Sequence, residues 1–278
     1  MKYVKLNNGI EMPMLGYGVF KVSDGTQCIE SVKVALATGY RSIDTAAVYG
    51  NEKSVGVAIK ESGVPREEIF LTTKVWNDVQ RTGDVEVAFA QSLKDLQTDY
   101  VDLYLIHWPV KGRFTDTWMT LENIYKSGRA KAIGISNFHD HHIEDIKKVW
   151  SVVPVINQIE LHPRLTQKPL IKFCKEHDII PEAWSPLGGT TPDASDNIVI
   201  REPLLKSIGD KYGKSPAQVI LRWNIDLGIV TIPKSVTPAR IKENFDIFDF
   251  ELTKDDITAI DSLNAGQRTG ASPENFSF

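Results

Sequence analysis

The chain has 278 residues, of which 42% are hydrophobic and 24% charged, and its formal net charge at pH 7 is −4. This composition is typical of a soluble globular protein, and its slight acidity gives no general affinity for nucleic acid or for an anionic membrane surface. The two cysteines, Cys28 and Cys174, form no CxxC motif and indicate no disulfide framework.

The first residues favour a cytoplasmic location. Lys2 and Lys5 are not followed by an apolar run, so no signal peptide is predicted. No stretch approaches the roughly 18 apolar residues that a membrane-spanning helix needs. No coiled-coil or repeat pattern forces association, and we expect a monomer.

The first predicted elements are a β-hairpin and a strand. Residues 3–6 and 10–12 flank Asn7-Asn8-Gly9, whose Asn-Gly pair favours a tight hairpin turn. A single hairpin is too small to be stable alone, so we expect it to cap a larger unit. Residues 15–19 are predicted as the first core strand.

Helical periodicity then alternates with short runs that are typical of strands. The predicted helices cover residues 26–38, 52–61, 82–96, 116–127, 143–150, 167–177, 203–212, 216–226, 238–244 and 254–263. The further predicted strands cover residues 41–44, 69–74, 100–107, 130–136, 155–159, 179–184 and 229–232. Asn51 and Ser215 are predicted helix N-caps, residues 186–200 form an irregular insertion, and the tail after Asn264 is predicted to be a loop.

This alternation predicts an α/β fold. Strands that alternate with helices pair in parallel, and eight such units at this length favour a closed barrel over an open doubly wound sheet. We therefore predict a (β/α)8 TIM barrel with an N-terminal β-hairpin cap and two extra helices. No linker or composition shift divides the chain, so residues 1–278 are expected to form a single domain.

Polar residues stand where the predicted strands end, and in such a barrel these ends form the rim that carries active sites. They are Asp44, Lys74, His107, Ser136, Asn137, Gln158, Trp184, Ser185, Lys234 and Ser235, and Tyr49 follows in the loop after the second strand. Taken alone, Lys74 also fits a solvated strand end and His107 a core histidine. Their convergence on one face favours a functional site.

The residue types at this rim suit proton transfer to an oxygen. A tyrosine has a pKa of about 10, and one cation about 4 Å away stabilises its phenolate by roughly 4 kcal/mol, an upper limit of about three pKa units. Lys74 can supply that charge, and Asp44 would hold the lysine ionised while cancelling part of its field. We therefore expect a lowered pKa for Tyr49, with His107 directing a substrate carbonyl towards it.

Protonation of a carbonyl needs a hydride donor, which a protein takes from a cofactor. The groups that suit a nicotinamide carboxamide and its ring are those of Ser136, Asn137, Gln158 and Trp184. Lys234, Ser235 and Arg240 cluster at the start of a predicted helix, where a 2'-phosphate binds well. The sequence therefore favours NADPH over NADH.

The chain resembles the aldo-keto reductase family over nearly its whole length. The motifs that carry the resemblance are LGYGVFK at 15–21, IDTAAVYGNE at 43–52, TTKVW at 72–76, DLYLIHWP at 102–109, GISNF at 134–138, NQIELHP at 157–163, AWSPLG at 183–188 and IPKSVTPARIKEN at 232–244. The short tail resembles the microbial branch that includes 2,5-diketo-gluconate reductases, methylglyoxal reductases and prostaglandin F synthases.

The resemblance implies roles for individual residues. The family's catalytic tetrad carries over to Asp44, Tyr49, Lys74 and His107, with Tyr49 as the acid. The implied cofactor contacts are Gly18, Val19, Ser136, Asn137, Gln158, Trp184, Ser185, Leu187, Lys234, Ser235, Val236, Thr237, Arg240, Glu243 and Asn244. The implied substrate pocket contains Phe20, Trp76 and Trp108. Many relatives have tyrosine at position 184 and tryptophan at position 20.

The expected function is the NADPH-dependent reduction of aldehydes and ketones to alcohols, with hydride from the nicotinamide and the proton from Tyr49. The short tail suggests an open pocket and broad use of small carbonyls such as methylglyoxal, aromatic aldehydes or keto sugars. One alternative is a Schiff-base aldolase that uses Lys74 as its nucleophile. Another is a non-catalytic NADPH-binding module.

A histidine-rich stretch follows the strand predicted at 130–136. His139, His141, His142 and Glu144 include metal-ligand types, but their spacing is poor for a compact site. Asp140 and Glu144 suit a helix N-terminus. The sequence therefore predicts a surface helix start here and no metal.

Overall fold

The computed structural model describes residues 1–189 and 197–278. The chain begins with the expected hairpin, in which β1 (Tyr3–Lys5) pairs antiparallel with β2 (Glu11–Pro13) and Val4 lies opposite Met12. The central part of the insertion expected at 186–200, residues 190–196, lies outside the described residues.

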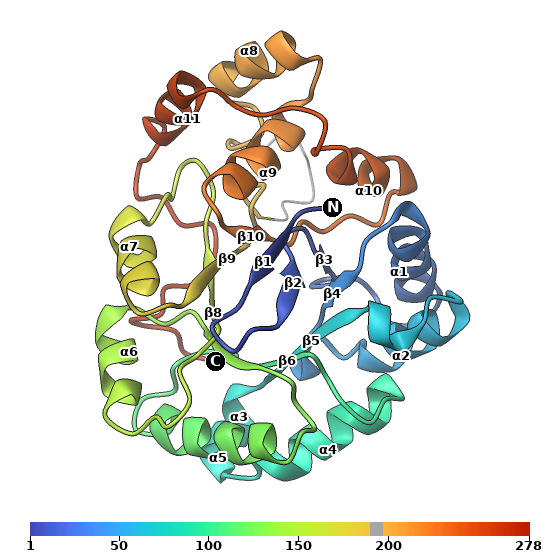
Figure 1. Cartoon of the computed structure of the whole chain (residues 1–278), viewed down its shortest axis with the longest axis vertical. Coiled ribbons are helices and arrows are strands. Elements are labelled where there is room, and N and C mark those ends of the chain that lie inside the picture. Colours follow the sequence, from blue (N-terminus) through green and yellow to red (C-terminus); the bar gives the residue numbers. More distant parts are fainter. Residues whose placement is uncertain (190–196) are drawn as a thin grey trace.

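Eight parallel strands form the central sheet, as expected, in the order of the sequence (Figure 1). They are β3 (Tyr17–Gly18), β4 (Ser42–Asp44), β5 (Phe70–Val75), β6 (Leu103–Ile106), β7 (Ile133–Ser136), β8 (Ile156–Glu160), β9 (Ile180–Trp184) and β10 (Val230–Thr231). The sheet closes on itself because Leu15 and Thr231 form a parallel bridge. The amide of Gly16 donates to the carbonyl of Thr231 at 2.9 Å, and that of Thr231 to the carbonyl of Met14 at 2.9 Å.

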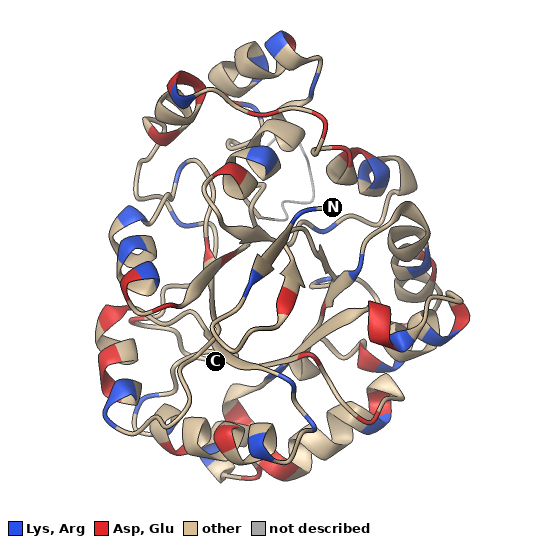
Figure 2. Ribbon diagram, viewed as in Figure 1, with Lys and Arg blue, Asp and Glu red and all other residues tan. Residues whose placement is uncertain are grey.

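Helices surround this barrel (Figure 1). They are α1 (Thr26–Thr38), α2 (Glu52–Glu61), α3 (Asn77–Thr82), α4 (Val85–Leu96), α5 (Phe114–Lys126), α6 (Asp140–Lys147), α7 (Lys168–Glu176), α8 (Pro203–Tyr212), α9 (Pro216–Asp226), α10 (Pro238–Phe245) and α11 (Lys254–Asp261). Eight of the eleven described helices alternate with the strands. Of the other three, α8 and α11 contact each other and match the two expected extra helices, and α3 is a short helix that was not predicted. Lys, Arg, Asp and Glu lie mainly on the outer helices, with both signs interspersed (Figure 2).

Two local predictions were wrong. The helix expected at 82–96 begins three residues later, at Val85, and the short helix α3 before it was not predicted; Gly83, left-handed with φ of 88°, ends α3. Asn51 precedes α2, but its side chain does not cap the helix. Its amide donates instead to the carbonyls of Val19 and Val22, each at 3.0 Å, and so ties the loop after β3 to α2. Ser215 caps α9 as predicted and accepts from the amide of Gln218.

The hairpin caps the barrel, as predicted, and the structure places it at the amino-terminal ends of the strands. Met12 is fully buried and belongs to a cluster with Leu103, Leu105 and Ile156, which come from β6 and β8. The Asn7 side chain donates to the carbonyls of residues 154 and 178, just before β8 and β9. The opposite end of the barrel is therefore left for the polar residues of the rim. In the described part of the chain, no helix is long and apolar enough to cross a membrane.

Candidate functional site

An ion pair between neighbouring strands lies at the centre of the rim. Lys74 on β5 is fully buried, and its ammonium lies 2.6 Å from Oδ1 of Asp44 at the end of β4. The same ammonium donates to the carbonyl of Thr45 at 2.9 Å. Burial acts to lower the pKa of Lys74, but Asp44, Tyr49 and Glu182 together outweigh it and raise the pKa. The lysine is therefore a fixed cation.

Tyr49 lies over this cation. It ends a short 3₁₀ helix, η1 (Ala47–Tyr49), and the Lys74 ammonium is 5.2 Å from the centre of its ring. Burial raises the pKa of the Tyr49 phenol to about 12, although Lys74 opposes this change. The expected lowering of this pKa was wrong, because the loss of hydration around the phenol outweighs the effect of the Lys74 charge.

His107 follows β6 and completes the cluster. Its ring meets the Tyr49 ring edge-on, with centroids 5.6 Å apart, and also the Trp76 ring, at 5.1 Å. Burial and the Lys74 charge hold the pKa of His107 well below its usual value, so the imidazole is neutral at pH 7. Within the described residues, its buried Nδ1 has no hydrogen-bond partner.

A second buried carboxyl, which sequence reasoning missed, extends this network. The side-chain amide of Gln158 donates to Asp44 Oδ2 and to Glu182 Oε2, both at 2.9 Å. Burial and the charge of Asp44 raise the pKa of Glu182 to about 8. A glutamate inside the otherwise apolar run of β9 was the available signal. Among the described residues, Oε1 of Gln158 accepts no hydrogen bond and remains available to a ligand.

Trp184 is fixed by the residues expected near a nicotinamide. Its indole N–H donates to Asn137 Oδ1 at 2.8 Å, and the Asn137 amide donates to the carbonyl of His107 at 2.9 Å. Asn137 has a φ of 65°, and the Ser136 hydroxyl donates to the carbonyl of Gln158. The N–H groups of Asn137 and Gln158 are thus used within the protein. They do not stand free for a carboxamide, and the indole is held by Oδ1 of Asn137.

Cations gather between β10 and α10. Lys234 is half-buried and Arg240 is exposed, in the first turn of α10. Burial and the charge of Lys21 lower the pKa of Lys234, which shows that Lys21, not singled out from the sequence, faces the same region. The amide of Thr237 donates to the hydroxyl of Ser235 at 3.1 Å, which shapes the turn into the helix. This donor set suits a phosphate.

At Gly18 the backbone of β3 passes close to the backbone of the loop that follows β10. A Cβ at this position would lie 3.2 Å from the carbonyl oxygen of Ile232, so a larger residue would crowd the loop. The amide of Val19 donates to the carbonyl of Asp44 at 3.0 Å. The other expected cofactor residues differ in exposure: Ser185, Leu187 and Glu243 are half-buried, Val236 is exposed and Asn244 is buried.

The expected substrate residues form an aromatic wall with the tail. Phe20 packs on Tyr49 with ring centroids 5.0 Å apart. The Phe278 ring stacks on Trp76 at 5.6 Å and meets Trp108 edge-on at 5.2 Å. Phe276 also packs on Trp108, at 5.1 Å. The tail therefore covers Trp76 and Trp108. This differs from the open pocket that we expected from the short tail.

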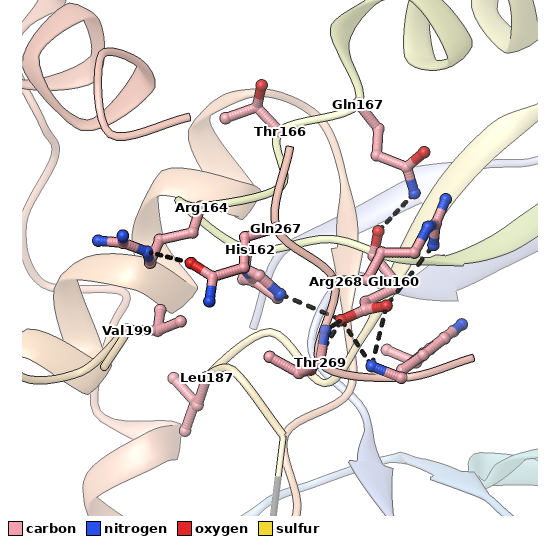
Figure 3. A network of polar contacts seen from close by, with 12 residues as sticks. Glu160, His162, Arg164, Thr166, Gln167, Leu187, Val199, Gln267, Arg268 and Thr269 are labelled. Atoms are coloured by element: carbon pink, nitrogen blue, oxygen red, sulfur yellow. Dashed lines mark hydrogen bonds and ion pairs between the residues drawn. The ribbon is translucent and has the colours of Figure 1, made fainter. Parts of the chain in front are cut away.

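The tail is anchored on the buried carboxylate of Glu160 at the end of β8 (Figure 3). Oε1 of Glu160 accepts from the amide of Thr269 at 2.6 Å, from its hydroxyl at 2.7 Å, and from the amide of Gly270 at 3.2 Å. His162 and Arg268 contact the same carboxylate at 3.2 and 3.5 Å. This anchor sets where the following residues cross the rim.

Comparisons with known proteins agree with this architecture. The model of the aldo/keto reductase family matches residues 14–265. The chain is 53% identical over 275 residues to glyoxal reductase of Bacillus subtilis (strain 168), which covers 99% of this chain and 97% of that protein. It is 46% identical over 275 residues to methylglyoxal reductase DkgA of Escherichia coli (strain K12), covering 98% and 97%. The crystal structure of an aldo/keto reductase from Brucella melitensis matches with a TM-score of 0.89 at 51% identity, covering 95% and 99%.

Proposed function

The chain belongs to the aldo/keto reductase family and is an oxidoreductase, and we propose that it reduces small aldehydes and ketones to alcohols with NADPH. Substrates of the methylglyoxal type, aromatic aldehydes and keto sugars are the proposed range. The names of the relatives that act on glyoxal and methylglyoxal support this class.

The observation that carries the proposal is the cluster of the buried Asp44, Lys74 and His107 with the half-buried Tyr49. The cluster holds one fixed cation, one phenol and one neutral imidazole around the same corner of the rim. Tyr49, whose pKa is raised, holds at pH 7 the proton that a general acid must donate, and the Lys74 charge favours the phenolate that donation leaves. These are the requirements of a general acid.

In the proposed reaction, a nicotinamide cofactor supplies the hydride, and the chain supplies the proton and the orientation. Tyr49 donates its hydroxyl proton to the substrate oxygen, and the Lys74 ammonium stabilises the phenolate that remains. Asp44 keeps that lysine charged and in place. His107, neutral at pH 7, donates a hydrogen bond that directs the carbonyl oxygen towards the phenol.

The residues present fit a phosphorylated dinucleotide. Gly18 leaves room where a Cβ would crowd the backbone, and Trp184 presents an indole fixed by Asn137. Lys234 and Arg240 supply cations for a 2'-phosphate at the start of α10. These features support NADPH in preference to NADH.

An aldolase mechanism is disfavoured by the same geometry. A Schiff-base lysine must lose its proton to act as a nucleophile. The Asp44 carboxylate, 2.6 Å from the Lys74 ammonium, raises the pKa of that lysine and keeps it charged.

The test is cofactor oxidation by the purified chain with methylglyoxal, a nitrobenzaldehyde and 2,5-diketo-gluconate, each with NADPH and NADH. Tyr49→Phe should lower turnover by about 10²- to 10⁴-fold, the usual contribution of a general acid. NADPH affinity, measured by fluorescence titration, should stay near that of the wild type. Turnover by the Phe variant at the wild-type rate would remove Tyr49 from the proton-donor role. Tight NADPH binding without turnover of any substrate would favour the non-catalytic module.

A further inference from the structure

Three potential metal ligands from distant parts of the chain meet at the rim. His139 precedes α6, His141 lies in its first turn, and Glu274 belongs to the tail. Each offers one ligand atom, and these atoms all lie within 4.8 Å of one another. Two imidazoles and a carboxylate form a set that zinc ions bind.

The orientation of these side chains favours a shared ligand. A carboxylate oxygen of Glu274 contacts Nδ1 of His139 and lies 3.7 Å from Nε2 of His141. Tetrahedral Zn²⁺ holds such ligands at about 2.0–2.2 Å, which separates them by roughly 3.3 Å. Since His141 and Glu274 are exposed, small side-chain rotations can reach this spacing.

A carboxylate stands behind one of the histidines. Nδ1 of His141 lies 3.6 Å from Oδ1 of Asp140, while its Nε2 points to the Glu274 side. Metal-binding histidines commonly have their second nitrogen next to a carboxylate, which fixes the tautomer and the ring orientation. Asp140 is placed to do this for His141.

One contact competes with a metal. A guanidinium nitrogen of Arg268 lies 3.3 Å from Nε2 of His139. If Nδ1 of His139 binds a metal, the proton of the neutral ring must lie on Nε2. The Nε2–H group and the Arg268 guanidinium would then be two hydrogen-bond donors facing each other. Arg268 has a second partner in the Glu160 carboxylate at 3.5 Å, so it can leave the histidine and stay on the barrel (Figure 3).

We propose that His139, His141 and Glu274 bind a divalent cation of the zinc type, with water as the remaining ligand, and that the ion clamps the tail over the aromatic wall. Sequence spacing alone did not predict this site, because the decisive carboxylate is Glu274 and not Glu144. Its effect on the reaction rests on the proposed function, whereas the binding itself does not.

The proposed metal ligand Glu274 is close in sequence to the tail residues that cover the aromatic wall. Two residues after Glu274, Phe276 packs on Trp108, and Phe278 stacks on Trp76. Asn77 and Arg81 of α3 donate to the carbonyl oxygen of Phe278, at 3.1 and 2.9 Å. The main chain of the tail is therefore already fixed at Phe278. An ion bound by Glu274 would fix it on the other side of Phe276 as well.

The first experiment titrates the full chain with Zn²⁺ alone against a chromophoric chelator at neutral pH. The wild type should bind one ion, and His141→Ala and Glu274→Gln should each weaken binding by about 100-fold, because each removes one of three protein ligands. Glu144→Gln is the matched control on the same helix and should bind as the wild type does. Equal affinity in all four proteins, or no binding by the wild type, would overturn the site.

The second experiment measures amide hydrogen exchange of residues 271–278 with and without Zn²⁺. Exchange should slow at least several-fold in the wild type and in Glu144→Gln, and should not change in Glu274→Gln. Equal exchange with and without bound Zn²⁺ in the wild type would overturn the clamp. Both readouts are independent of turnover, so an inactive protein that binds Zn²⁺ would contradict the proposed function and leave the metal site in place.

Discussion

At the scale of single residues, the protonation of the site is set by burial and by neighbours together. Lys74 stays charged because Asp44 is 2.6 Å away, while Tyr49 and Glu182 hold their protons because burial penalises their anions. His107 is kept neutral for the same reason. The result is a buried cluster with one compensated ion pair and three neutral groups at pH 7.

Glu182 makes stability depend on pH. Its pKa is raised to about 8 in the folded chain, whereas an unfolded glutamate ionises near 4.5. Between these values the folded state holds a proton that the unfolded state releases, so stability falls as pH rises through this window. Glu182→Gln keeps a neutral acceptor for Gln158 and should lose less stability than the wild type between pH 5 and pH 8.

Urea unfolding at several pH values measures this difference. The exposed Glu176→Gln serves as the control and should follow the wild type. Parallel curves for the wild type and Glu182→Gln would show that the buried carboxyl does not hold its proton.

Arg240 tests the cofactor preference. Its guanidinium is exposed at the start of α10, so removing it should cost a charge-assisted contact to a 2'-phosphate. Such a contact is worth about 1.5–3 kcal/mol, or roughly 10- to 100-fold in affinity. Arg240→Ala should therefore weaken NADPH binding by that factor and leave NADH binding nearly unchanged, as measured by fluorescence titration.

Lys242→Ala removes a charge from the last turn of the same helix and should change neither affinity appreciably. Equal losses for both cofactors in Arg240→Ala would contradict the phosphate assignment.

At the scale of elements, close packing decides which substitutions a helix tolerates. Helices α2 and α4 pack side by side, and Gly56 on α2 faces the end of α4. A Cβ at position 56 would lie 2.6 Å from the carbonyl oxygen of Leu96. The glycine is thus required by the contact, although it lowers the intrinsic helix propensity of α2.

Gly56→Ala should therefore destabilise the chain. Alanine gains about 1 kcal/mol over glycine in a free helix, but overpacking against backbone costs about 1–3 kcal/mol and should outweigh it. The exposed Lys60→Ala on the same helix should change the free energy of unfolding by less than about 0.5 kcal/mol. Thermal or urea unfolding measures both, and a stabilised Gly56→Ala would mean that the two helices can separate without loss.

At the scale of the whole molecule, the hairpin belongs to the barrel core. Met12 is fully buried against residues of β6 and β8, although the hairpin is remote from both in sequence. Met12→Ala should lower the free energy of global unfolding by about 2–5 kcal/mol, the usual cost of removing a buried large side chain. Denaturant unfolding monitored by tryptophan fluorescence measures it.

Tyr3→Ala is the control, because this side chain is 51% exposed; a change within about 0.5 kcal/mol is expected. An unchanged global transition in Met12→Ala would show that the hairpin unfolds separately from the barrel.

The amino-acid sequence was enough to predict the strand-helix alternation, the hairpin cap and the rim positions of Asp44, Lys74 and His107. These follow from local periodicity, turn residues and the rule that parallel strands end on one side, none of which needs long-range coordinates. Even here the predicted boundaries of an element differ from the observed ones, since α4 begins at Val85 and not at residue 82.

Features that depend on residues far apart in the chain could be seen only in the folded protein. The raised pKa of Tyr49 arises from the loss of hydration in a packed site, and the role of Glu182 from its register with Gln158 on the neighbouring strand. The position of Phe276 and Glu274 over the rim depends on the Glu160 anchor more than 100 residues earlier in the sequence. Such contacts are set by packing across the barrel, and no local pattern encodes them.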